Sequence, residues 1–425
     1  MTIILADTIA VADGLPMTGK PESVGLSSQR LQRITSTFNA DVATGRIPGA
    51  VVLVARRGKT AYLQAVGFQD RDKQLPMQRD SIFRIASMTK PVVAVAALML
   101  MEEGKLALID PVSRYLPEFK DLKVGVEQVD AATGQRHLTL EPLRRPITVQ
   151  DLLRHTSGLT YGPFGDSLVQ RLYRENKVMD DQQTNAEMVT KLAALPLAFQ
   201  PGTTFEYSMS TDVVGRIVEV VSGMNLEQFV RERITAPLRM SNTGFLLDER
   251  NAARLALPQS DPVSGTSGVL FAYVMARPPK WFSGGGGMLS TAADYARFCQ
   301  MLLNSGELDG VRLLSRDSVA LMTSDHLPPG AGFGTFTQEL GITAPLPEFG
   351  QGYGLGIGVR KEQGRSPVPG SVGDFYWGGA LGTYFWVDPQ KQLIAVMMLQ
   401  EIDITKRTQY RSVLRNLVYQ ALDDG

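Results

Sequence analysis

Strand-like segments occur near both ends of this chain, while the long stretch between them is mainly helical. Residues 49–56 and 60–67 are apolar and rich in β-branched side chains, which predicts a hairpin with one buried face. Four further strand signals come late, at residues 353–360, 372–377, 383–387 and 393–399. Two groups of strands can share one core only if both ends of the chain contribute to the same sheet. The sequence therefore predicts an α/β fold with one sheet built from both termini and a helical lobe inserted between them.

The length of 425 residues is too great for one ordinary core. We predict a discontinuous α/β sheet domain from residues 22–103 and 286–425, with residues 1–21 as an N-terminal extension. A mainly helical domain, residues 104–285, is inserted between its halves, and its polar segment 128–146 is expected to be an irregular surface excursion. Helical periodicity predicts the clearest helices at residues 27–44, 148–154, 185–195, 211–221, 225–234, 292–303 and 407–422.

The charge balance argues against several kinds of partner. Lys plus Arg and Asp plus Glu both number 43, without a basic run, so we expect no nucleic-acid partner. The longest apolar run, residues 91–101, is far shorter than the roughly 20 residues of a membrane-spanning helix, so we expect no membrane partner. The apolar start, residues 1–12, has no early Lys or Arg, which favours a cytoplasmic location. The oligomeric state is left open.

Metal and thiol chemistry find little support in the sequence. The three histidines, His137, His155 and His326, lie far apart without carboxylates or cysteines at ligand spacing, so we expect no metal and no cofactor. Cys299, the only cysteine, sits in an apolar helical pattern and is expected to be a core residue. The Gly-x-Ser-x-Gly elbow is absent, so a Ser-His-Asp triad has no good candidate.

The tetrapeptide Ser87-Met88-Thr89-Lys90 is the strongest candidate for an activated nucleophile. It follows a strand-like run and precedes an apolar helix, and no other serine has a lysine three places on. Residues three apart share a helix face, so the Lys90 amine and the Ser87 hydroxyl would lie one turn apart. Pro91 is best tolerated near a helix start, which places Ser87 where the helix dipole favours developing negative charge.

A second candidate is Tyr207, in the run Phe205-Glu206-Tyr207-Ser208-Met209 ahead of a predicted helix. A tyrosine held beside Lys90 can exist partly as phenolate, because a nearby cation favours the charged form. It would then take the Ser87 proton and return it to a leaving alcohol. A tyrosine that caps the core with its hydroxyl in water fits this motif equally well.

The third candidate is the run Tyr376-Trp377-Gly378-Gly379-Ala380, between two strand signals. Paired glycines let a backbone approach a ligand closely. An N–H from this edge, together with that of Ser87, would bind the oxyanion of a tetrahedral intermediate. A bulge or a hairpin turn is the simpler interpretation of the two glycines.

The order Ser-x-x-Lys, Tyr-Ser-x and Trp-Gly-Gly resembles the family VIII carboxylesterases, which are serine hydrolases built like class C β-lactamases and penicillin-binding proteins. The resemblance covers most of the chain and includes residues 110–117, 152–159 and 284–294. It implies a β-lactamase/transpeptidase-like α/β fold, in which an antiparallel sheet from both chain termini is flanked by helices. It also implies that Ser87 is the acylated nucleophile, with Lys90 and Tyr207 as its proton relay. It also implies an oxyanion hole from the Ser87 and Ala380 amides, and substrate-binding positions at Trp377, Gly378, Gly379, Tyr161 and Met209.

Two departures from the β-lactamase pattern bear on the substrate. Met209 stands at the third position of the Tyr-x-Asn motif and cannot bond a substrate amide. The Lys-Thr-Gly motif is replaced by Trp377-Gly378-Gly379, so the cation that would meet a β-lactam carboxylate is missing. Both changes favour short-chain carboxylic esters, with weak cephalosporin hydrolysis as a side reaction. The alternatives are an acyltransferase, a β-lactamase or D-Ala carboxypeptidase, and a non-catalytic ligand sensor.

Overall fold

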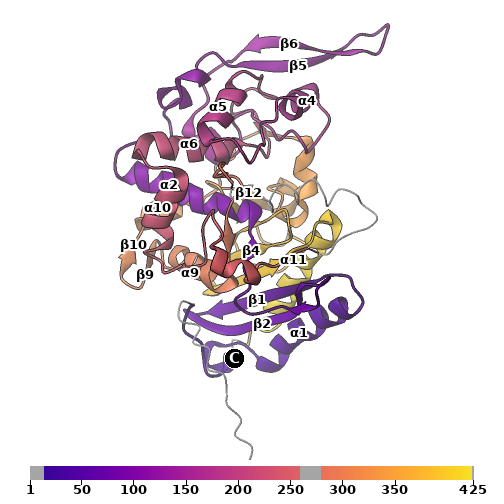
Figure 1. Cartoon of the computed structure of the whole chain (residues 1–425), viewed down its shortest axis with the longest axis vertical. Helices are drawn as coiled ribbons and strands as arrows, with labels where there is room; N and C mark the ends of the chain where they lie inside the picture. The colour runs from indigo at the N-terminus through magenta and orange to yellow at the C-terminus, as the bar shows by residue number, and fades with distance from the viewer. Residues whose placement is uncertain (1–13, 259–278, 424–425) are drawn as a thin grey trace, which may run out of the picture.

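The computed structural model describes residues 14–258 and 279–423, in which one large sheet is the centre of the fold (Figure 1). Within these residues eight strands pair antiparallel in the order β12-β13-β14-β15-β16-β1-β2-β3. Strands β1 and β16 come from opposite ends of the chain and pair from Ala50–Leu399 to Arg56–Leu393. The prediction of one antiparallel sheet made from both termini is confirmed. The strands are β1 (Gly49–Arg56), β2 (Lys59–Asp70), β3 (Leu75–Pro76), β12 (Gln351–Tyr353), β13 (Gly358–Arg360), β14 (Phe375–Gly378), β15 (Tyr384–Asp388) and β16 (Leu393–Leu399).

Helices cover both faces of this sheet. Helices α1 (Ser28–Ala43) and α11 (Ile404–Tyr419) pack against each other, and α1 also packs on β1 and β2 (Figure 1). Helix α9 (Ala292–Leu303) packs on β1, β15 and β16. Every residue of β1 is buried, as expected for a strand with a layer on each side.

Helix α2 (Thr89–Glu102) runs through the core between the sheet and the other helices. Its residues from Thr89 to Leu100 are all buried, so it has no polar face. It packs against α6 (Ser210–Ser222) and α7 (Leu226–Val230). A 3₁₀ turn, η2 (Ala86–Met88), leads into α2 and carries Ser87. Among the described helices, the most deeply buried one therefore begins at the candidate nucleophile.

The middle of the chain is mainly helical, with one exception. Helices α3 (Val149–Leu153), α4 (Leu168–Glu175) and α5 (Asn185–Ala193) each begin with a capping box. The expected irregular segment 128–146 instead contributes to a hairpin of β5 (Lys123–Val129) and β6 (Arg136–Pro142), at the end of the molecule opposite α1 (Figure 1). Most of β6 is exposed, and its apolar alternation is limited to Leu138 and Leu140, which is a weak signal for a strand. That expectation was wrong about the structure, although the segment does lie at the surface.

The single strand expected at residues 353–360 is also wrong. The chain there forms two strands, β12 and β13, which pair with each other across a turn closed by a bond from Gly354 N to Ile357 O. The remaining short elements are β4 (Phe83–Arg84), β7 (Thr204–Phe205), β8 (Leu289–Ser290), β9 (Glu307–Leu308), β10 (Val311–Arg312), β11 (Gly332–Phe333), α10 (Arg316–Met322) and the helical turns η1 (Pro21–Val24), η3 (Val112–Arg114), η4 (Pro117–Phe119), η5 (Arg231–Thr235), η6 (Glu249–Arg254), η7 (Thr335–Thr343) and η8 (Pro347–Phe349).

The predicted domain boundaries stay a prediction. Residues 1–13 of the predicted extension and 259–278 of the predicted helical domain lie outside the described residues. Within the part of the chain that the structure describes, no helix is long and apolar enough to cross a membrane. Cys299 is fully buried, as predicted, and burial raises the pKa of its thiol well above the usual value, which makes the thiol inert.

Candidate active site

Ser87 lies in a tightly held turn at the start of α2. The preceding residue, Ala86, has a φ of 44°, in the left-handed region that non-glycine residues rarely adopt. The turn is fixed on both sides, because Ile85 N donates to Met288 O (3.1 Å) and Thr383 Oγ1 donates to Ile85 O (3.1 Å). Ser87 itself is half-buried. Backbone strain retained in such a turn is common at functional sites, where surrounding contacts hold it in place.

Lys90 is wholly buried and directs its amine at Ser87. Its Nζ lies 3.3 Å from Ser87 Oγ, as the three-residue spacing predicts, 3.1 Å from Tyr161 OH and 2.7 Å from Gly285 O. These three bonds use all the donors of an ammonium group. Within residues 14–258 and 279–423, no carboxylate lies within 4.0 Å of this amine. Lys90 is thus a buried amine surrounded by neutral oxygen atoms.

A carboxylate lies one step further away, and sequence reasoning did not identify it. Asp212 Oδ1 accepts from Gly285 N (3.0 Å) and from Ser283 Oγ (2.5 Å), so it orients the peptide whose neighbouring carbonyl holds Lys90. Burial raises the pKa of Asp212, and the positive charge of Lys90 opposes that rise. A Cβ at position 285 would lie 2.4 Å from Asp212 Oδ2, so only glycine fits there. These contacts join residues far apart in sequence, and no local pattern signals them.

Tyr207 lies beside the same amine, with its ring facing it. Lys90 Nζ is 4.4 Å from the centre of the Tyr207 ring, and Trp377 Nε1 donates to Tyr207 OH at 3.2 Å. An indole N–H only donates, so the Tyr207 oxygen accepts here and its own O–H remains free to donate. Among the described residues, Trp377 is the only hydrogen-bond partner of this hydroxyl. The second and third sequence motifs therefore meet at one hydrogen bond.

Tyr161 lies closer to the centre of the site than the sequence indicated. Its hydroxyl bonds Lys90, and its ring packs edge-on against Tyr207 at 5.7 Å between ring centres. Burial, followed by the negative charge of Asp212, raises the pKa of Tyr161 well above the usual value, so this phenol stays protonated. It acts as a fixed neutral partner of the lysine.

The ring of His155 packs against the ring of Tyr207. Its ring lies 4.8 Å from the Tyr207 ring, and its Nδ1 accepts from Ser208 N at 3.3 Å. Burial, with the nearby charge of Lys90, lowers its pKa well below the usual value, so the ring is neutral. His155 therefore satisfies a backbone N–H of the loop that carries Tyr207.

The glycine pair of the third motif approaches the nucleophile's turn closely. A Cβ on Gly379 would lie 2.5 Å from Ile85 O, so glycine is required at this position. Gly379 N donates to Thr383 O (2.8 Å), whereas Ala380 N donates no hydrogen bond within the described chain. Ala380, for which an oxyanion role is predicted, therefore has an N–H without an internal bond in the described chain, one residue beyond the close approach of Gly379 to Ile85.

The remaining predicted positions differ in accessibility. Gly378 is partly buried, and its Cα faces the guanidinium of Arg411, because a Cβ there would lie 2.5 Å from Arg411 Nη2. Trp377 and Met209 are both wholly buried, at 1% and 0% exposure. Substrate contacts of these residues stay a prediction. The structure brings Ser87, Lys90, Tyr161, Tyr207 and Trp377 together through hydrogen bonds and ring contacts.

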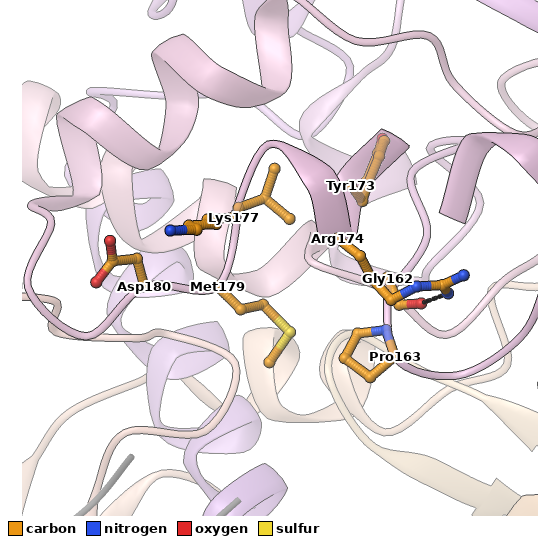
Figure 2. A pocket seen from close by; sticks show the side chains of 8 residues that line it. Gly162, Pro163, Tyr173, Arg174, Lys177, Met179 and Asp180 are labelled. Carbon is orange, nitrogen blue, oxygen red and sulfur yellow. Dashed lines mark hydrogen bonds between the residues drawn. The ribbon is translucent and has the colours of Figure 1, made fainter. Parts of the chain in front are cut away.

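A separate pocket of about 410 Å³ begins one residue beyond Tyr161 (Figure 2). Arg174 crosses its wall and donates to Gly162 O (2.6 Å) and Gly165 O (2.7 Å). None of the residues around this pocket belongs to the cluster at Ser87; they are Gly162, Pro163, Tyr173, Arg174, Lys177, Val178, Met179 and Asp180. The pocket shares a loop with the site but not its reactive groups.

A serine and a lysine three residues apart at the start of a buried helix, beside an antiparallel sheet flanked by helices, define the serine hydrolases built like β-lactamases and penicillin-binding proteins. The sequence profile of the Beta-lactamase family matches residues 34–419. The chain belongs to this family and is an enzyme of the serine hydrolase class. The resemblance to the family VIII carboxylesterases is confirmed, together with the fold that it implies.

Relatives and solved structures agree with this assignment along most of the chain. Protein Rv1367c of Mycobacterium tuberculosis is 40% identical over 367 residues, covering 84% of this chain and 86% of that protein. Esterase EstB of Burkholderia gladioli is 32% identical over 375 residues, covering 84% of this chain and 86% of the esterase. The solved structure of EstCE1, described as a hydrolase with promiscuous acyltransferase activity, has a TM-score of 0.73 at 29% identity and covers 92% of this chain and 99% of its own.

Proposed function

We propose that this enzyme hydrolyses short-chain carboxylic esters through a covalent acyl-Ser87 intermediate. The observation that carries the proposal is the contact between the buried Lys90 amine and the Ser87 hydroxyl at 3.3 Å. A serine hydroxyl becomes a competent nucleophile only when a neighbouring group takes its proton. Esterase EstB, named for this activity, supports the same assignment.

Acylation follows from the positions of the three groups. Ser87 Oγ attacks the ester carbonyl carbon while its proton passes to the Lys90–Tyr207 pair. The carbonyl oxygen becomes an oxyanion, for which the Ser87 and Ala380 N–H groups are the proposed donors. The intermediate collapses by breaking the bond to the alcohol oxygen, which receives a proton from Tyr207. The hydroxyl of Tyr207 suits this task, because the Trp377 N–H donates to its oxygen and leaves its O–H free to donate.

Deacylation repeats the same steps with water. Water attacks the acyl carbon of Ser87 and gives its proton to the relay; Ser87 Oγ then leaves and regains a proton, and the carboxylic acid is released. Lys90 Nζ lies 4.4 Å from the centre of the Tyr207 ring, so we assign the proton in transit to the pair and not to either residue alone.

The groups around the site favour uncharged substrates. Trp377 stands where β-lactamases carry the lysine of Lys-Thr-Gly, and its indole N–H is already bonded to Tyr207. A cation for a β-lactam carboxylate is therefore missing at this position. We expect ester turnover to exceed nitrocefin turnover by a wide margin, and a reversed ranking would favour the β-lactamase alternative.

The test is Ser87→Ala assayed on p-nitrophenyl butyrate, with the exposed Ser36→Ala on α1 as the matched control. We expect a fall of kcat of about 10⁴-fold or more for Ser87→Ala and no change for Ser36→Ala. Mass spectrometry of the wild type with a slowly deacylated ester should place one acyl group on Ser87. Full activity of Ser87→Ala would refute the proposal.

A second candidate function is acyl transfer, which the description of EstCE1 favours. In that reaction an alcohol replaces water at deacylation, and the acyl-enzyme is the same. Adding a primary alcohol at increasing concentration and measuring the new ester against the free acid distinguishes the two. A transfer product that dominates at low alcohol concentration would make transfer the principal activity.

A further inference from the structure

Arg411, on helix α11, is a buried cation with no carboxylate beside it. Its side chain is 5% exposed, and no carboxylate within the described residues forms an ion pair with it. Nη2 donates to Gly379 O (2.9 Å), Nη1 donates to Thr343 Oγ1 (3.3 Å), and Nε has no partner. Burying an unpaired charge is costly, so its retention needs a reason.

The carbonyl that Arg411 holds belongs to the peptide of the proposed oxyanion donor. Gly379 C=O and Ala380 N–H are the two ends of one planar peptide unit, and the described chain has no cis peptide bond. In a trans peptide the two groups point in opposite directions. Gly379 O also accepts from Gly382 N at 3.1 Å. Fixing this oxygen from the α11 side therefore aims the Ala380 N–H away from α11.

A second arginine acts on the next carbonyl. Arg407, one helical turn before Arg411, donates to Ala380 O and, among the described residues, forms no ion pair. Burial lowers the pKa of both guanidinium groups, to about 10 for Arg411, and both are cations at neutral pH. Two positive charges thus lie against the two carbonyls that flank the Ala380 N–H.

We propose that Arg411, assisted by Arg407, is a positioning residue that orients and polarises the Gly379–Ala380 peptide and so strengthens the Ala380 N–H as an oxyanion donor. A cation on a carbonyl oxygen withdraws electron density from the amide and makes its N–H more acidic. The fixed charges also favour negative charge developing nearby, without reorganisation during the reaction. The inference rests on the proposed function, in which the Ala380 amide receives the oxyanion.

A purely structural role for Arg411 would be to fasten α11 to the sheet. Such a role predicts lower stability but an unchanged oxyanion in every folded molecule. The test must therefore measure the oxyanion itself. An alkyl trifluoromethyl ketone provides this, because Ser87 Oγ adds to its carbonyl carbon and the former carbonyl oxygen becomes a hydroxyl that ionises in the oxyanion hole. The ¹⁹F resonance of the adduct follows that ionisation as pH is varied.

Three variants separate the two roles. Arg411→Met removes both the charge and the bond to Gly379, while Arg411→Lys keeps a charge near the same carbonyl. Arg415→Gln is the matched control, because Arg415 is an equally buried arginine one turn further along α11 that pairs with Asp374 (2.8 Å). It touches the sheet but no part of the Gly379–Ala380 peptide.

We expect Arg411→Met to raise the pKa of the adduct hydroxyl by about one unit and to lower kcat about tenfold, with KM within twofold. Arg411→Lys should fall between Arg411→Met and the wild type. Arg415→Gln should lower the unfolding temperature and leave both the adduct pKa and kcat unchanged.

The outcomes separate this inference from the proposed function. If the wild type forms no adduct on Ser87, the proposed nucleophile is wrong. If wild type and Arg411→Met form adducts with the same hydroxyl pKa, the positioning role of Arg411 is wrong while the nucleophile stands. If Arg411→Met does not fold, Arg411→Lys and Arg407→Gln decide, and unchanged adduct pKa values in both would overturn the proposal.

Discussion

Buried charges occur in two regions of this molecule, and the two regions treat them in opposite ways. Between the sheet and α11, Asp374 is paired with Arg360 (3.0 Å) and Arg415 (2.8 Å), and all three side chains are almost fully buried. Lys90 and Asp212 around Ser87, by contrast, are buried without an ion pair within the described residues, and so is Glu206, which precedes Tyr207 in the chain. The Asp374 cluster pairs its charges directly. The site, together with Arg407 and Arg411 behind the Gly379–Ala380 peptide, has no such ion pairs among the described residues.

The difference indicates which region is built for stability and which for chemistry. A buried ion pair recovers its desolvation cost only when both partners are well satisfied, as in the Asp374 cluster. Buried carboxyl groups that lack a direct counter-ion have shifted pKa values, and such groups gather at functional sites. Burial raises the pKa of Glu206 to about 7 and also raises that of Asp212. The separation of charges around Ser87 is thus a second argument, independent of the motifs, for its chemical role.

The largest effect is expected for Lys90→Met, which removes the amine from Ser87. We expect kcat/KM on p-nitrophenyl butyrate to fall about 10³-fold or more, since the proton relay of Ser87 loses one of its two members. Stability should change little, because no carboxylate loses a partner. The exposed Lys105→Met, just beyond the end of α2, is the control. A large loss of stability with retained activity would show that Lys90 serves stability and not chemistry, contrary to the comparison.

Asp374→Asn should show the opposite pattern. It leaves Arg360 and Arg415 buried without the negative charge that pairs with both of them, so the free energy of unfolding should fall by about 3–5 kcal/mol. The folded fraction should keep its kcat, because the cluster lies outside the group of residues that contact Lys90 and Ser87. Denaturant unfolding and active-site titration measure the two quantities. A loss of kcat per active site would show that the cluster also serves the reaction.

The sequence predicted the local part of the site well. The contact between Lys90 and Ser87 depends only on a three-residue spacing on a helix, so it followed from the motif and is confirmed at 3.3 Å. A single sheet from both termini followed from strand signals at both ends of the chain, and the pairing of β1 with β16 confirms it. The proximity of Tyr207 to Lys90 came from the resemblance to a family and had no basis in spacing.

The parts that the sequence did not predict depend on long-range contacts, or lie in a segment with only a weak apolar pattern. The bond from Lys90 to Gly285 and the support of Gly285 by Asp212 join segments far apart in the chain, so no periodicity records them. The hairpin of β5 and β6 was missed because β6 is mostly exposed and its apolar alternation is limited to Leu138 and Leu140. The catalytic and substrate-binding roles assigned to individual residues stay predictions that the variants above test.

Glu206→Gln sharpens the comparison, because removing a charge should stabilise this region. The pKa of Glu206 is raised to about 7 in the folded protein, whereas its usual value is 4.5. The folded state therefore holds a proton that the unfolded chain releases, and wild-type stability falls as pH rises from about 4.5 to 7. The variant should unfold like the wild type at pH 4 and be more stable by about 3 kcal/mol at pH 8.

The bond from Thr160 Oγ1 to Glu206 Oε1 (2.6 Å) can persist in this variant, because the amide oxygen of glutamine also accepts. Urea unfolding at the two pH values measures the difference. If the stability difference between variant and wild type is the same at both pH values, Glu206 is ionised in the folded protein without a cost in stability. Glu206 would then not count among the buried charges that lack compensation. Asp374→Asn and Glu206→Gln are the same change of charge, yet one should destabilise the protein and the other stabilise it.

Trp377→Phe should have the smallest effect of these substitutions. It tests whether the neutral indole N–H of Trp377 assists Tyr207 in the reaction. Phenylalanine keeps an aromatic ring beside Tyr207 but removes the N–H that bonds Tyr207 OH at 3.2 Å. A neutral hydrogen bond contributes about 1 kcal/mol, so we expect kcat to fall about fivefold.

The chain offers a matched control for this change. Trp386 on β15 is as deeply buried as Trp377, but its Nε1 has no partner and its ring lies over Arg415, at 4.9 Å from the guanidinium carbon. Trp386→Phe should therefore lower stability through lost ring contacts and leave kcat unchanged. If Trp377→Phe also left kcat unchanged, the lone pair of Tyr207 would need no fixed donor. Orientation of its proton toward the leaving alcohol would then depend on the neighbouring rings alone, since Tyr161, His155 and Trp377 all pack against it.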